Sequence, residues 1–300
     1  MHCKPDISLI VSSFERPSHL QRCLHSIAAQ NADRSRIEVV VADDGSRDET
    51  QDMVRKFVRT TGIAVKFTSH PHDGFRLAQC RNEGVLASTA EYLLFTDGDC
   101  ILPSDHVSLH LRYRRRRCVM AGSCYRLDAE ASDRLSLERI QSGDLFSLVA
   151  PREARRVYWK SVRAKGYEFL RLPMRPRLPG GNMGVWRTDF ERMNGFDENF
   201  VGWGMEDKDF QRRLESAGIR CIFTRTRVYH LWHPRHPTYS HKSLHTANYH
   251  YYHRAGKLKA RCESGFSERR SAGFVCNAFE PTLPHFSETA PKQAGVEAEV

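Results

Sequence analysis

The stretch Tyr92-Leu93-Leu94-Phe95-Thr96-Asp97-Gly98-Asp99 joins a short apolar run to a pair of carboxylates. An apolar run of this length, ended by turn-forming residues, predicts a buried strand with the acidic pair at its carboxyl end. Three earlier strands are predicted by similar runs at Ile7–Val11, Ile37–Ala42 and Ala64–Phe67. Segments with the helical spacing of apolar residues follow the strands, and they begin at Pro17, run through Met53–Val58 and Arg76–Ala87, and resume from Pro103.

This alternation of strands and helices indicates an α/β fold, in which a mostly parallel sheet carries helices on both faces. Ligands of such sheets bind beyond the carboxyl ends of the strands. Polar segments follow three of the predicted strands, at Ser12–Arg16, Asp43–Ser46 and Asp97–Asp99. We therefore expect these three segments to meet at one edge of the sheet.

The composition is that of a globular protein, with 40% hydrophobic and 27% charged residues in a chain of 300. No apolar run approaches the roughly 20 residues of a membrane-spanning helix. The segment before the first predicted strand is too short for a signal peptide, so we expect a cytoplasmic protein or a peripheral one at the inner face of a membrane. The nine cysteines form no Cys-x-x-Cys motif and are expected to be buried thiols.

The chain has a net charge of +10, and its basic residues are densest in the segments 112–117 and 152–177. A solvated face with counter-charge for anionic ligands explains this charge, and so does attraction to an anionic membrane or a lipid-linked acceptor. No nucleic-acid-binding motif accompanies the charge, so nucleic acid is not an expected partner.

The acidic pair Asp97 and Asp99 has the chemistry of a divalent cation site. Gly98 between them permits a close approach of the backbone. Carboxylate oxygens suit Mg²⁺ or Mn²⁺, which would act as a Lewis acid on a diphosphate leaving group. The alternative is a solvated acidic turn. At Asp43–Ser46 the alternative is likewise turn chemistry, although a carboxylate there could accept a hydrogen bond from a nucleobase on which Phe14 stacks.

A second acidic cluster stands in Gly202-Trp203-Gly204-Met205-Glu206-Asp207-Lys208-Asp209, which opens a predicted helix. Asp207 lies three residues before Phe210 and shares its inward stripe, whereas Asp209 is expected off that stripe. An ionised carboxylate in a first helical turn either caps the helix or serves as a general base. Together with the acidic pair at the strand end, this cluster suggests transfer of a sugar from a nucleotide donor.

The rest of the chain is less patterned. Residues 126–178 predict a basic insertion with some helix, and a second α/β stretch runs from Ile219–Thr224 to Val228–Trp232. His241 and His245 have a spacing that zinc sites use, but no acidic or cysteine partner lies close to them, so zinc is not expected. Residues 265–300 are expected to form a polar tail that is disordered from residue 287 on.

Several of these motifs together resemble family 2 glycosyltransferases of the GT-A fold. The second half resembles the galactosyltransferase module of β-1,4-galactosyltransferases, chondroitin polymerases and polypeptide N-acetylgalactosaminyltransferases. The motifs that carry the resemblance are Val11-Ser12-Ser13-Phe14-Glu15-Arg16-Pro17, Asp43-Asp44-Gly45-Ser46, Arg81-Asn82-Glu83-Gly84, Asp97-Gly98-Asp99, Gly180-Gly181-Asn182-Met183, Gly195-Phe196-Asp197-Glu198 and Gly202-Trp203-Gly204-Met205-Glu206-Asp207.

On the donor side, the resemblance implies a UDP-sugar pocket. Asp44 matches the residue that binds uracil in this fold, and Ser12 and Phe14 line the same pocket. Arg76 falls in the region that approaches the ribose and the diphosphate.

For metal and catalysis, the resemblance implies that Asp99 is a ligand of Mn²⁺ or Mg²⁺. Asp97 then contacts ribose or metal-bound water, and His230 matches a metal-binding histidine. Glu206 matches a contact to the donor or acceptor sugar, and Asp207 matches the general base of inverting enzymes.

We therefore expect a metal-dependent inverting hexosyltransferase that moves a hexose or N-acetylhexosamine from a UDP-sugar to a saccharide or lipid-linked saccharide, in surface glycan or lipopolysaccharide synthesis. Residues 1–125 would bind the nucleotide-sugar, 126–178 would form a variable insertion, and 179–264 would bind the acceptor and hold the catalytic residues. A retaining transferase of the same fold and a basic, non-catalytic binding module for membrane or nucleic acid stay open as alternatives. A nucleotidyltransferase is less favoured, because no Gly-rich, Lys-containing phosphate loop follows the first strand.

Overall fold

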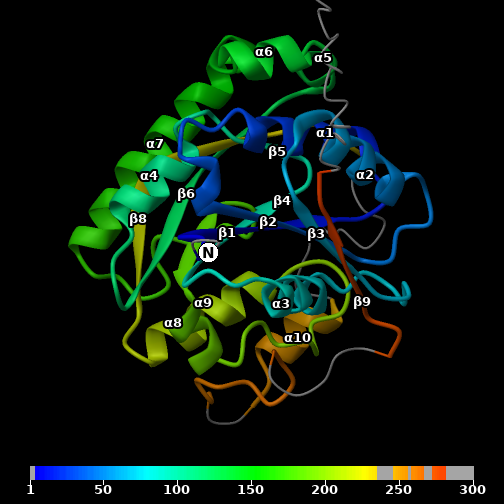
Figure 1. Ribbon diagram of the computed structural model, residues 1–300. Helices are drawn as coiled ribbons and strands as arrows, with labels where there is room; N and C mark the ends of the chain where they lie inside the picture. Colours follow the sequence, from blue (N-terminus) through cyan, green and yellow to red (C-terminus); the bar gives the residue numbers. More distant parts are fainter. Residues whose placement is uncertain (1–3, 235–245, 256–257, 267–271, 282–300) are drawn as a thin grey trace, which may run out of the picture.

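A single mixed sheet of nine strands organises the molecule, in the order β5-β8-β6-β7-β4-β1-β2-β3-β9 (Figure 1). The computed structural model describes residues 4–234, 246–255, 258–266 and 272–281. The strands are β1 (Ile7–Ser13), β2 (Ile37–Asp43), β3 (Val65–Ser69), β4 (Tyr92–Asp97), β5 (Cys100–Ile101), β6 (Cys118–Arg126), β7 (Met183–Trp186), β8 (Arg220–His230) and β9 (Val275–Phe279).

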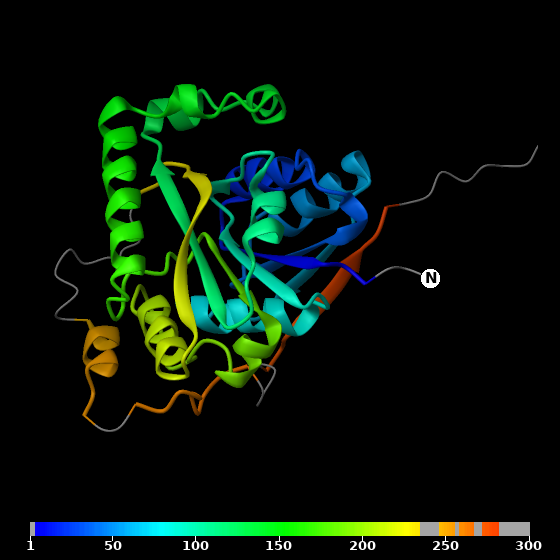
Figure 2. The same ribbon diagram turned by 90° about the vertical axis from the view of Figure 1, so that its left-hand side faces the viewer.

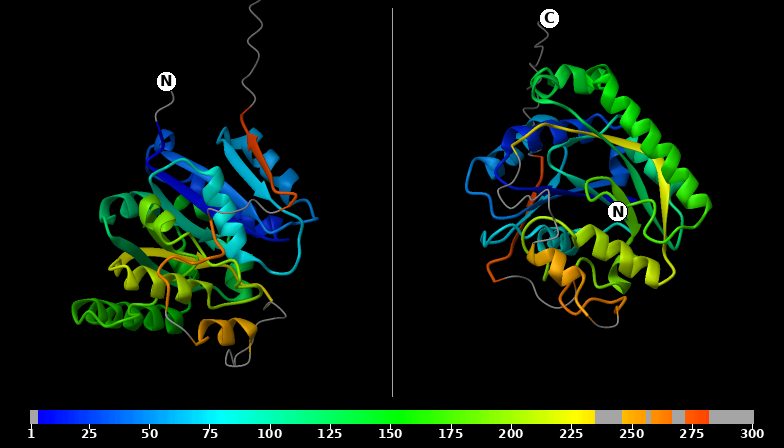
Figure 3. Two further views of the ribbon diagram at one scale, coloured as in Figure 1. Left: turned by 90° about the horizontal axis from the view of Figure 1, so that it is seen from below. Right: turned by 180° about the vertical axis from the view of Figure 1, so that it is seen from behind.

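Helices cover both faces of this sheet, as the alternating pattern predicts. They are α1 (Pro17–Ala28), α2 (Thr50–Thr61), α3 (Leu77–Ala87), α4 (His106–Tyr113), α5 (Ala129–Asp133), α6 (Leu137–Ser142), α7 (Pro151–Phe169), α8 (Arg187–Arg192), α9 (Glu206–Ser216) and α10 (Ala247–Tyr252), with 3₁₀ turns at Arg34–Arg36 and Phe146–Leu148. Helices α1, α2 and α4 pack on one face, and α3, α8 and α9 pack on the other (Figures 1 and 3).

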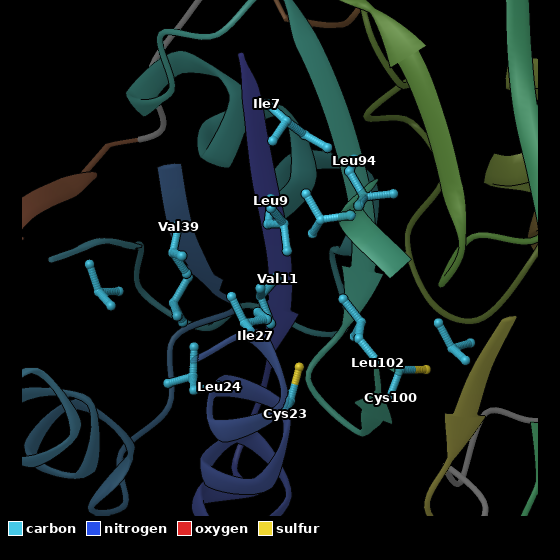
Figure 4. Packing of buried hydrophobic residues seen from close by; sticks show 14 of the residues in the cluster. Ile7, Leu9, Val11, Cys23, Leu24, Ile27, Val39, Leu94, Cys100 and Leu102 are labelled. Carbon is cyan, nitrogen blue, oxygen red and sulfur yellow. The ribbon is translucent and has the colours of Figure 1, made fainter. Parts of the chain in front are cut away.

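The core follows from the two-residue period of a strand. In β1, Ile7, Leu9 and Val11 point to the face that α1 covers, whereas Ile10 belongs to the cluster under α3. Figure 4 shows Leu24 and Ile27 of α1 beside this first set. Both faces of the strand are therefore buried, which explains its continuous apolar run.

Strands β1 to β4 are parallel to one another, and their register brings the polar strand ends together. Ser12 of β1 lies opposite Asp97 of β4, and Ser13 lies opposite Asp43 of β2. The backbone continues this pairing past the strand end, because the Asp44 N–H donates to the Ser13 carbonyl over 2.9 Å. The expected meeting of the three polar segments at one sheet edge is confirmed.

The structure differs from the sequence expectations outside these strands. Helix α4 begins at His106 rather than at Pro103. One eleven-residue strand, β8, occupies the second α/β stretch, with a register shift against β6 between Ala121 and Ser123. The insertion 126–178 is mainly helical and contains the 19-residue helix α7.

The segment expected to be a polar tail contains strand β9, which pairs antiparallel with β3 at the sheet edge. The expected disorder from residue 287 on lies outside the described residues, as do His241 and His245. The eight described cysteines carry no disulfide, and all but Cys124 and Cys276 are buried, as predicted. No helix among the described residues is long and apolar enough to cross a membrane.

Candidate active site

A cleft of about 950 Å³ opens at the carboxyl ends of β1, β2 and β4. These strand ends contribute Ser12, Asp44, Asp97 and Asp99 to its lining. The end of β8 and the segment after it, together with the loop that leads into α9, complete the cleft with His230, His233, Trp203, Glu206 and Asp207. The structure thus brings together in one cavity residues from both halves of the chain.

Two imidazoles converge on one carboxylate in this cleft. The Nε2 atom of His233 lies 3.1 Å from Oδ2 of Asp99, and the Nε2 atom of His230 lies 3.6 Å from Oδ1. One ligand atom from each of the three side chains lies within 4.8 Å of the others. We call Asp99, His230 and His233 the histidine cluster; one carboxylate and two neutral imidazoles are a donor set for a divalent transition metal.

The electrostatics keep Asp99 ionised. Burial by itself would raise the pKa of Asp99, but His230, His233 and Arg16 outweigh burial and hold the pKa well below its usual range. Asp99 in turn raises the pKa of His233 through their hydrogen bond. Cys100, which lies beside Asp99, is a poor additional ligand because burial raises the pKa of its thiol well above the ordinary value.

A buried arginine organises a second group of carboxylates on the other side of the cleft. The Nη1 atom of Arg81 donates to Oδ1 of Asp207 over 2.9 Å, and Nη2 donates to Oδ1 of Asp97 over 3.1 Å. Oε1 of Glu206 lies 3.6 Å from Nη1. We call these four residues the arginine cluster. Arg81 packs under it against the Phe196 ring, with its guanidinium carbon 5.3 Å from the ring centroid.

The three carboxyls of this cluster share one cation, and this excess of acid affects Glu206 and Asp207. Burial and the neighbouring Asp207 raise the pKa of Glu206 to about 8. Burial also raises the pKa of Asp207, although Arg81 opposes that shift. Glu206 is the better place for a shared proton, because its side chain is 8% exposed against 26% for Asp207 and it lies farther from the guanidinium. Asp207 is then the ionised partner at neutral pH.

Gly180 and Gly181 make room for these carboxylates. A Cβ atom on Gly180 would lie 2.5 Å from an oxygen of Asp207, and one on Gly181 would lie 2.6 Å from an oxygen of Asp97. Contacts this short do not occur, so any side chain at either position would displace an acid. The two glycines therefore allow the backbone to lie close to the carboxylates of the site.

The loop before α9 aims Asp207 into the cleft. Gly202, Gly204 and Met205 have positive φ angles of 86°, 89° and 80°. The left-handed Met205 is strained, and strain of this kind gathers at functional sites. Met205 is also the N-cap residue and makes no side-chain cap, and Asp207 bonds to Arg81. The capping alternative for Asp207 is therefore wrong.

The expectation that Asp209 lies off the buried side of α9 is also wrong. Asp209 is fully buried, and its Oδ2 accepts from Nε of Arg213 over 2.6 Å. A buried arginine one turn later makes this position tolerable for a carboxylate, which apolar periodicity alone does not indicate.

Asp44 is held by a buried chain of charged groups. Its Oδ1 lies 3.0 Å from Nε2 of His70, whose Nδ1 lies 2.6 Å from Glu83. Burial would lower the pKa of His70, but the two carboxylates outweigh it and raise the pKa to about 9. Phe14 stacks on His72 with ring centroids 4.3 Å apart. Both Asp44 and Phe14 line the cleft.

Ser12 and Arg76 differ in their relation to the cleft. The Ser12 hydroxyl lines it and is buried without a hydrogen-bond partner among the described residues, so it is available to a ligand. The Arg76 guanidinium instead pairs with Asp73 and does not belong to the cleft lining. The backbone N–H of Arg76 donates to Oδ2 of Asp44 over 3.1 Å, so Arg76 lies beside the cleft, and its approach to a diphosphate stays a prediction.

Sequence reasoning missed Arg81 and His233 as cleft residues, and it placed Arg16 at the ligand-binding edge without giving it a role. Arg81 stands in a motif that the resemblance used without giving it a role, and His233 follows His230 at a distance of three residues. Arg81 stands next to Asn82 and Glu83 in α3, and all three are buried, which apolar periodicity does not indicate because charged side chains are rarely buried.

Comparison with known proteins places this chain in a family. The sequence model of glycosyl transferase family 2 matches residues 8–188. The sequence model described as the N-terminal domain of galactosyltransferase matches residues 168–237. Validoxylamine A glucosyltransferase of Streptomyces hygroscopicus subsp. jinggangensis is 30% identical over 241 residues, which are 74% of this chain and 54% of that protein. Chondroitin synthase of Escherichia coli is 25% identical over 230 residues, which are 72% of this chain and 33% of that protein.

Solved structures share the fold. The mannosyltransferase PcManGT of Pyrobaculum calidifontis, in complex with GDP-Man and Mn²⁺, has a TM-score of 0.56 at 19% identity over 79% of this chain and 59% of that chain. TarS of S. aureus with UDP-GlcNAc has a TM-score of 0.52 at 14% identity over 77% of this chain and 60% of that one.

The chain spans about half the length, or less, of the curated relatives given above. The match to the family 2 model nevertheless covers more than half of this chain, from β1 into α8. The cleft lies at the ends of strands within that match. The expected GT-A fold is confirmed, and the chain belongs to glycosyl transferase family 2, a family of enzymes that transfer sugars.

Proposed function

We propose that the protein is an inverting, metal-dependent glycosyltransferase that moves a hexose or N-acetylhexosamine from a UDP-sugar to a saccharide acceptor. The observation that carries this proposal is the pairing of the histidine cluster with Asp207 in one cleft. One side of the cleft has ligands for a cation that binds a diphosphate, and the other has a carboxylate whose raised pKa suits proton abstraction.

The donor would enter along the ends of β1 and β2. Asp44 is proposed to accept from the uracil N–H, and the Ser12 hydroxyl and the Phe14 ring would line the same pocket. Proteins of this fold have been solved with GDP-Man and with UDP-GlcNAc, which supports a nucleotide-sugar without deciding the base. We choose UDP because a single buried carboxylate at Asp44 fits the one imide donor of uracil.

Asp99, His230 and His233 would hold the cation. Two imidazoles favour Mn²⁺ over Mg²⁺, because Mg²⁺ prefers oxygen ligands only. When bound, the cation supplies Lewis-acid stabilisation of the departing diphosphate. Arg16, with Nη1 3.4 Å from Asp99, is placed to add positive charge on the same side. Asp97 is proposed to contact ribose or metal-bound water from its position between Asp99 and Arg81.

Asp207 would act as the general base. It takes the proton of an acceptor hydroxyl, the hydroxyl oxygen forms a bond to the anomeric carbon, and the bond from that carbon to the diphosphate oxygen breaks. Attack from the face opposite the leaving group inverts the anomeric configuration. Protonated Glu206 beside it can donate a hydrogen bond to a sugar oxygen, which an ionised carboxylate cannot do.

The acceptor is proposed to be a saccharide or a lipid-linked saccharide of a surface glycan or lipopolysaccharide. By their names, one relative transfers glucose to validoxylamine A and the other synthesises chondroitin, which supports a carbohydrate-like acceptor. The exposed Trp203 at the cleft edge offers an apolar face on which a sugar ring can stack.

A panel of UDP-, GDP- and CMP-sugars tests the proposal. UDP release from one UDP-sugar that requires Mn²⁺ and a saccharide acceptor is the expected result, and NMR of the product shows the inverted anomer. Release that is equally fast in the presence of a chelator contradicts the metal role. A product with the donor's own anomeric configuration identifies the enzyme as retaining.

A further inference from the structure

Helix α7 presents an apolar stripe to solvent on the outer side of the molecule. Its buried residues, Val157 and Ala164, pack toward β6 and β8, and Figure 2 shows the helix standing outside those strands. The side chains on its far side are exposed by 61% at Tyr158, 57% at Trp159, 86% at Phe169 and 63% at Leu170. With Val162 they cover an arc of roughly 120° around the helix. Exposed apolar patches of this kind mark interaction sites.

Basic side chains border the stripe and also interrupt it, since the exposed Arg155 falls between Val162 and Trp159 around the helix. Residues 151–172 contain seven arginines and lysines against two glutamates, Glu153 and Glu168. Both glutamates pair within the helix, with Arg156 and Lys165. The remaining basic residues have no carboxylate partner in the described part of the chain; they are Arg152, Arg155, Lys160, Arg163 and Arg171.

We propose that α7 docks the enzyme on an anionic phospholipid surface. Aromatic and aliphatic side chains on one face, bordered by lysine and arginine, are the composition of helices that lie in a membrane interface. Trp159 and Tyr158 have the amphipathic rings that settle at headgroup level. The unpaired arginines attract anionic headgroups, and this attraction falls as salt screens it.

The charge of α7 argues against a second copy of the chain as the partner that covers its exposed face. A two-fold symmetric contact would place the same surface of both copies face to face. Arg155 and Arg163 of each copy would then approach the cations of the other without a carboxylate between them. An anionic bilayer meets the same cations with opposite charge.

Helix α7 lies next to the cleft, so docking there would bring a membrane-bound acceptor close to the site. This part of the inference rests on the proposed function. In the first turn of the helix, Glu153 accepts from the Arg126 backbone N–H over 2.8 Å, and Arg126 lines the cleft. The chain after α7 leads directly to Arg177 and Leu178, which line the cleft as well. A membrane against α7 would thus hold a lipid-linked acceptor beside the cleft opening.

Vesicle sedimentation of the full chain tests the proposal. We expect binding to phosphatidylcholine vesicles that contain phosphatidylglycerol, little binding to phosphatidylcholine alone, and weaker binding at high salt. Trp159→Ser with Phe169→Ser, and separately Arg155→Glu with Arg163→Glu, should each weaken binding by roughly tenfold or more. The matched control is Lys56→Glu with Arg59→Glu on α2, which changes the net charge equally at exposed positions on another side of the molecule and should leave binding within about threefold.

Quenching of tryptophan fluorescence by brominated lipids locates the contact. The conservative variant Trp159→Phe should still bind anionic vesicles but should lose most of the quenching. Persistent quenching in that variant, equal binding of the control and α7 variants, or no binding by the parent protein would each overturn the proposal. Dissociation of a dimer by the α7 substitutions without any vesicle binding would overturn it in favour of self-association.

These outcomes are separate from the proposed reaction. Turnover with a water-soluble acceptor should be unchanged by the α7 substitutions, because none of the four residues lines the cleft. Absence of turnover in the parent protein would contradict the proposed glycosyl transfer but would not affect the conclusion from vesicle binding.

Discussion

The two sides of the cleft differ in how they balance charge. In the histidine cluster, His230, His233 and Arg16 depress the pKa of the single carboxyl of Asp99 and keep it ionised. In the arginine cluster, three carboxyls surround one guanidinium, and the pKa of Glu206 rises to about 8. Asp97 and Asp99 each offer a ligand atom within 4.8 Å of the other, yet Asp97 pairs with Arg81 whereas Asp99 faces the two imidazoles. One cleft can therefore bind a cation on one side and hold a proton acceptor on the other.

The largest expected effect comes from removing the only carboxylate of the histidine cluster. Asp99→Ala should abolish Mn²⁺-dependent donor binding and turnover, since two imidazoles alone hold Mn²⁺ weakly. Isothermal titration of Mn²⁺ and UDP measures the loss, and a melting temperature near that of the parent shows that the fold persists. A fully active Asp99→Ala enzyme would show that the histidine cluster does not bind a cation needed for the reaction.

Asp207→Asn should cost on the order of 10²–10⁴-fold in kcat, the range of general acid–base contributions. The amide keeps the size of the side chain but cannot take a proton. Steady-state kinetics and a UDP titration measure the effect, and UDP binding should not change. If the variant keeps most of its kcat, the base lies elsewhere and Glu206 becomes the next candidate.

Arg81→Met should destabilise the protein by about 3–5 kcal/mol, because the partners of a buried ion pair are left uncompensated. Urea unfolding measures this change. The control Arg81→Lys keeps the charge but lacks the planar fork that reaches both Asp97 and Asp207, so it should recover stability better than activity. An Arg81→Met protein as stable as the parent would show that the carboxyls simply take up protons.

The histidine cluster contains one ligand that the sequence motif did not indicate. His233→Ala should weaken Mn²⁺ binding by roughly tenfold or more while donor binding at saturating Mn²⁺ partly recovers. His19→Ala is a control nearby, because His19 bonds to the Trp232 carbonyl and does not belong to the metal-ligand group. Unchanged Mn²⁺ affinity in His233→Ala would show that His233 is not a ligand and would leave Asp99 and His230 as the proposed ligands.

The smallest expected effect is a pH dependence at the nucleotide end of the cleft. The folded pKa of His70 is about 9, above the unfolded value near 6.5, so protonation of His70 stabilises the fold. This stabilisation is complete below about pH 6.5 and is lost as the pH rises through 9. The melting temperature should therefore fall across that interval by more in the parent than in His70→Gln. Parallel curves for the two proteins would show that His70 is neutral in the fold.

Periodicity and strand-end chemistry predicted much of the nucleotide-binding half from sequence. The strands β1 to β4 are short, buried on both faces and separated by regular helices, so local apolar patterns are sufficient to place them. Their parallel order then forces Ser12, Asp44 and Asp99 to one edge, whatever the details of packing. The assignment of the motifs to glycosyl transferase family 2 also followed from residues that can be read in the sequence.

Only the tertiary structure decided which side chains share a charge. Arg81 and Asp207 are 126 residues apart, and their pairing depends on how α3 and α9 pack against the same face of the sheet. Packing between distant segments likewise explains why β9 joins β3. The pairs Asp209–Arg213 and Asp73–Arg76 lie within four residues of each other along the chain, but apolar periodicity does not reveal them. A local pattern reports whether a position is buried, whereas the protonation and partner of a buried charge depend on neighbours that the fold brings from distant parts of the chain.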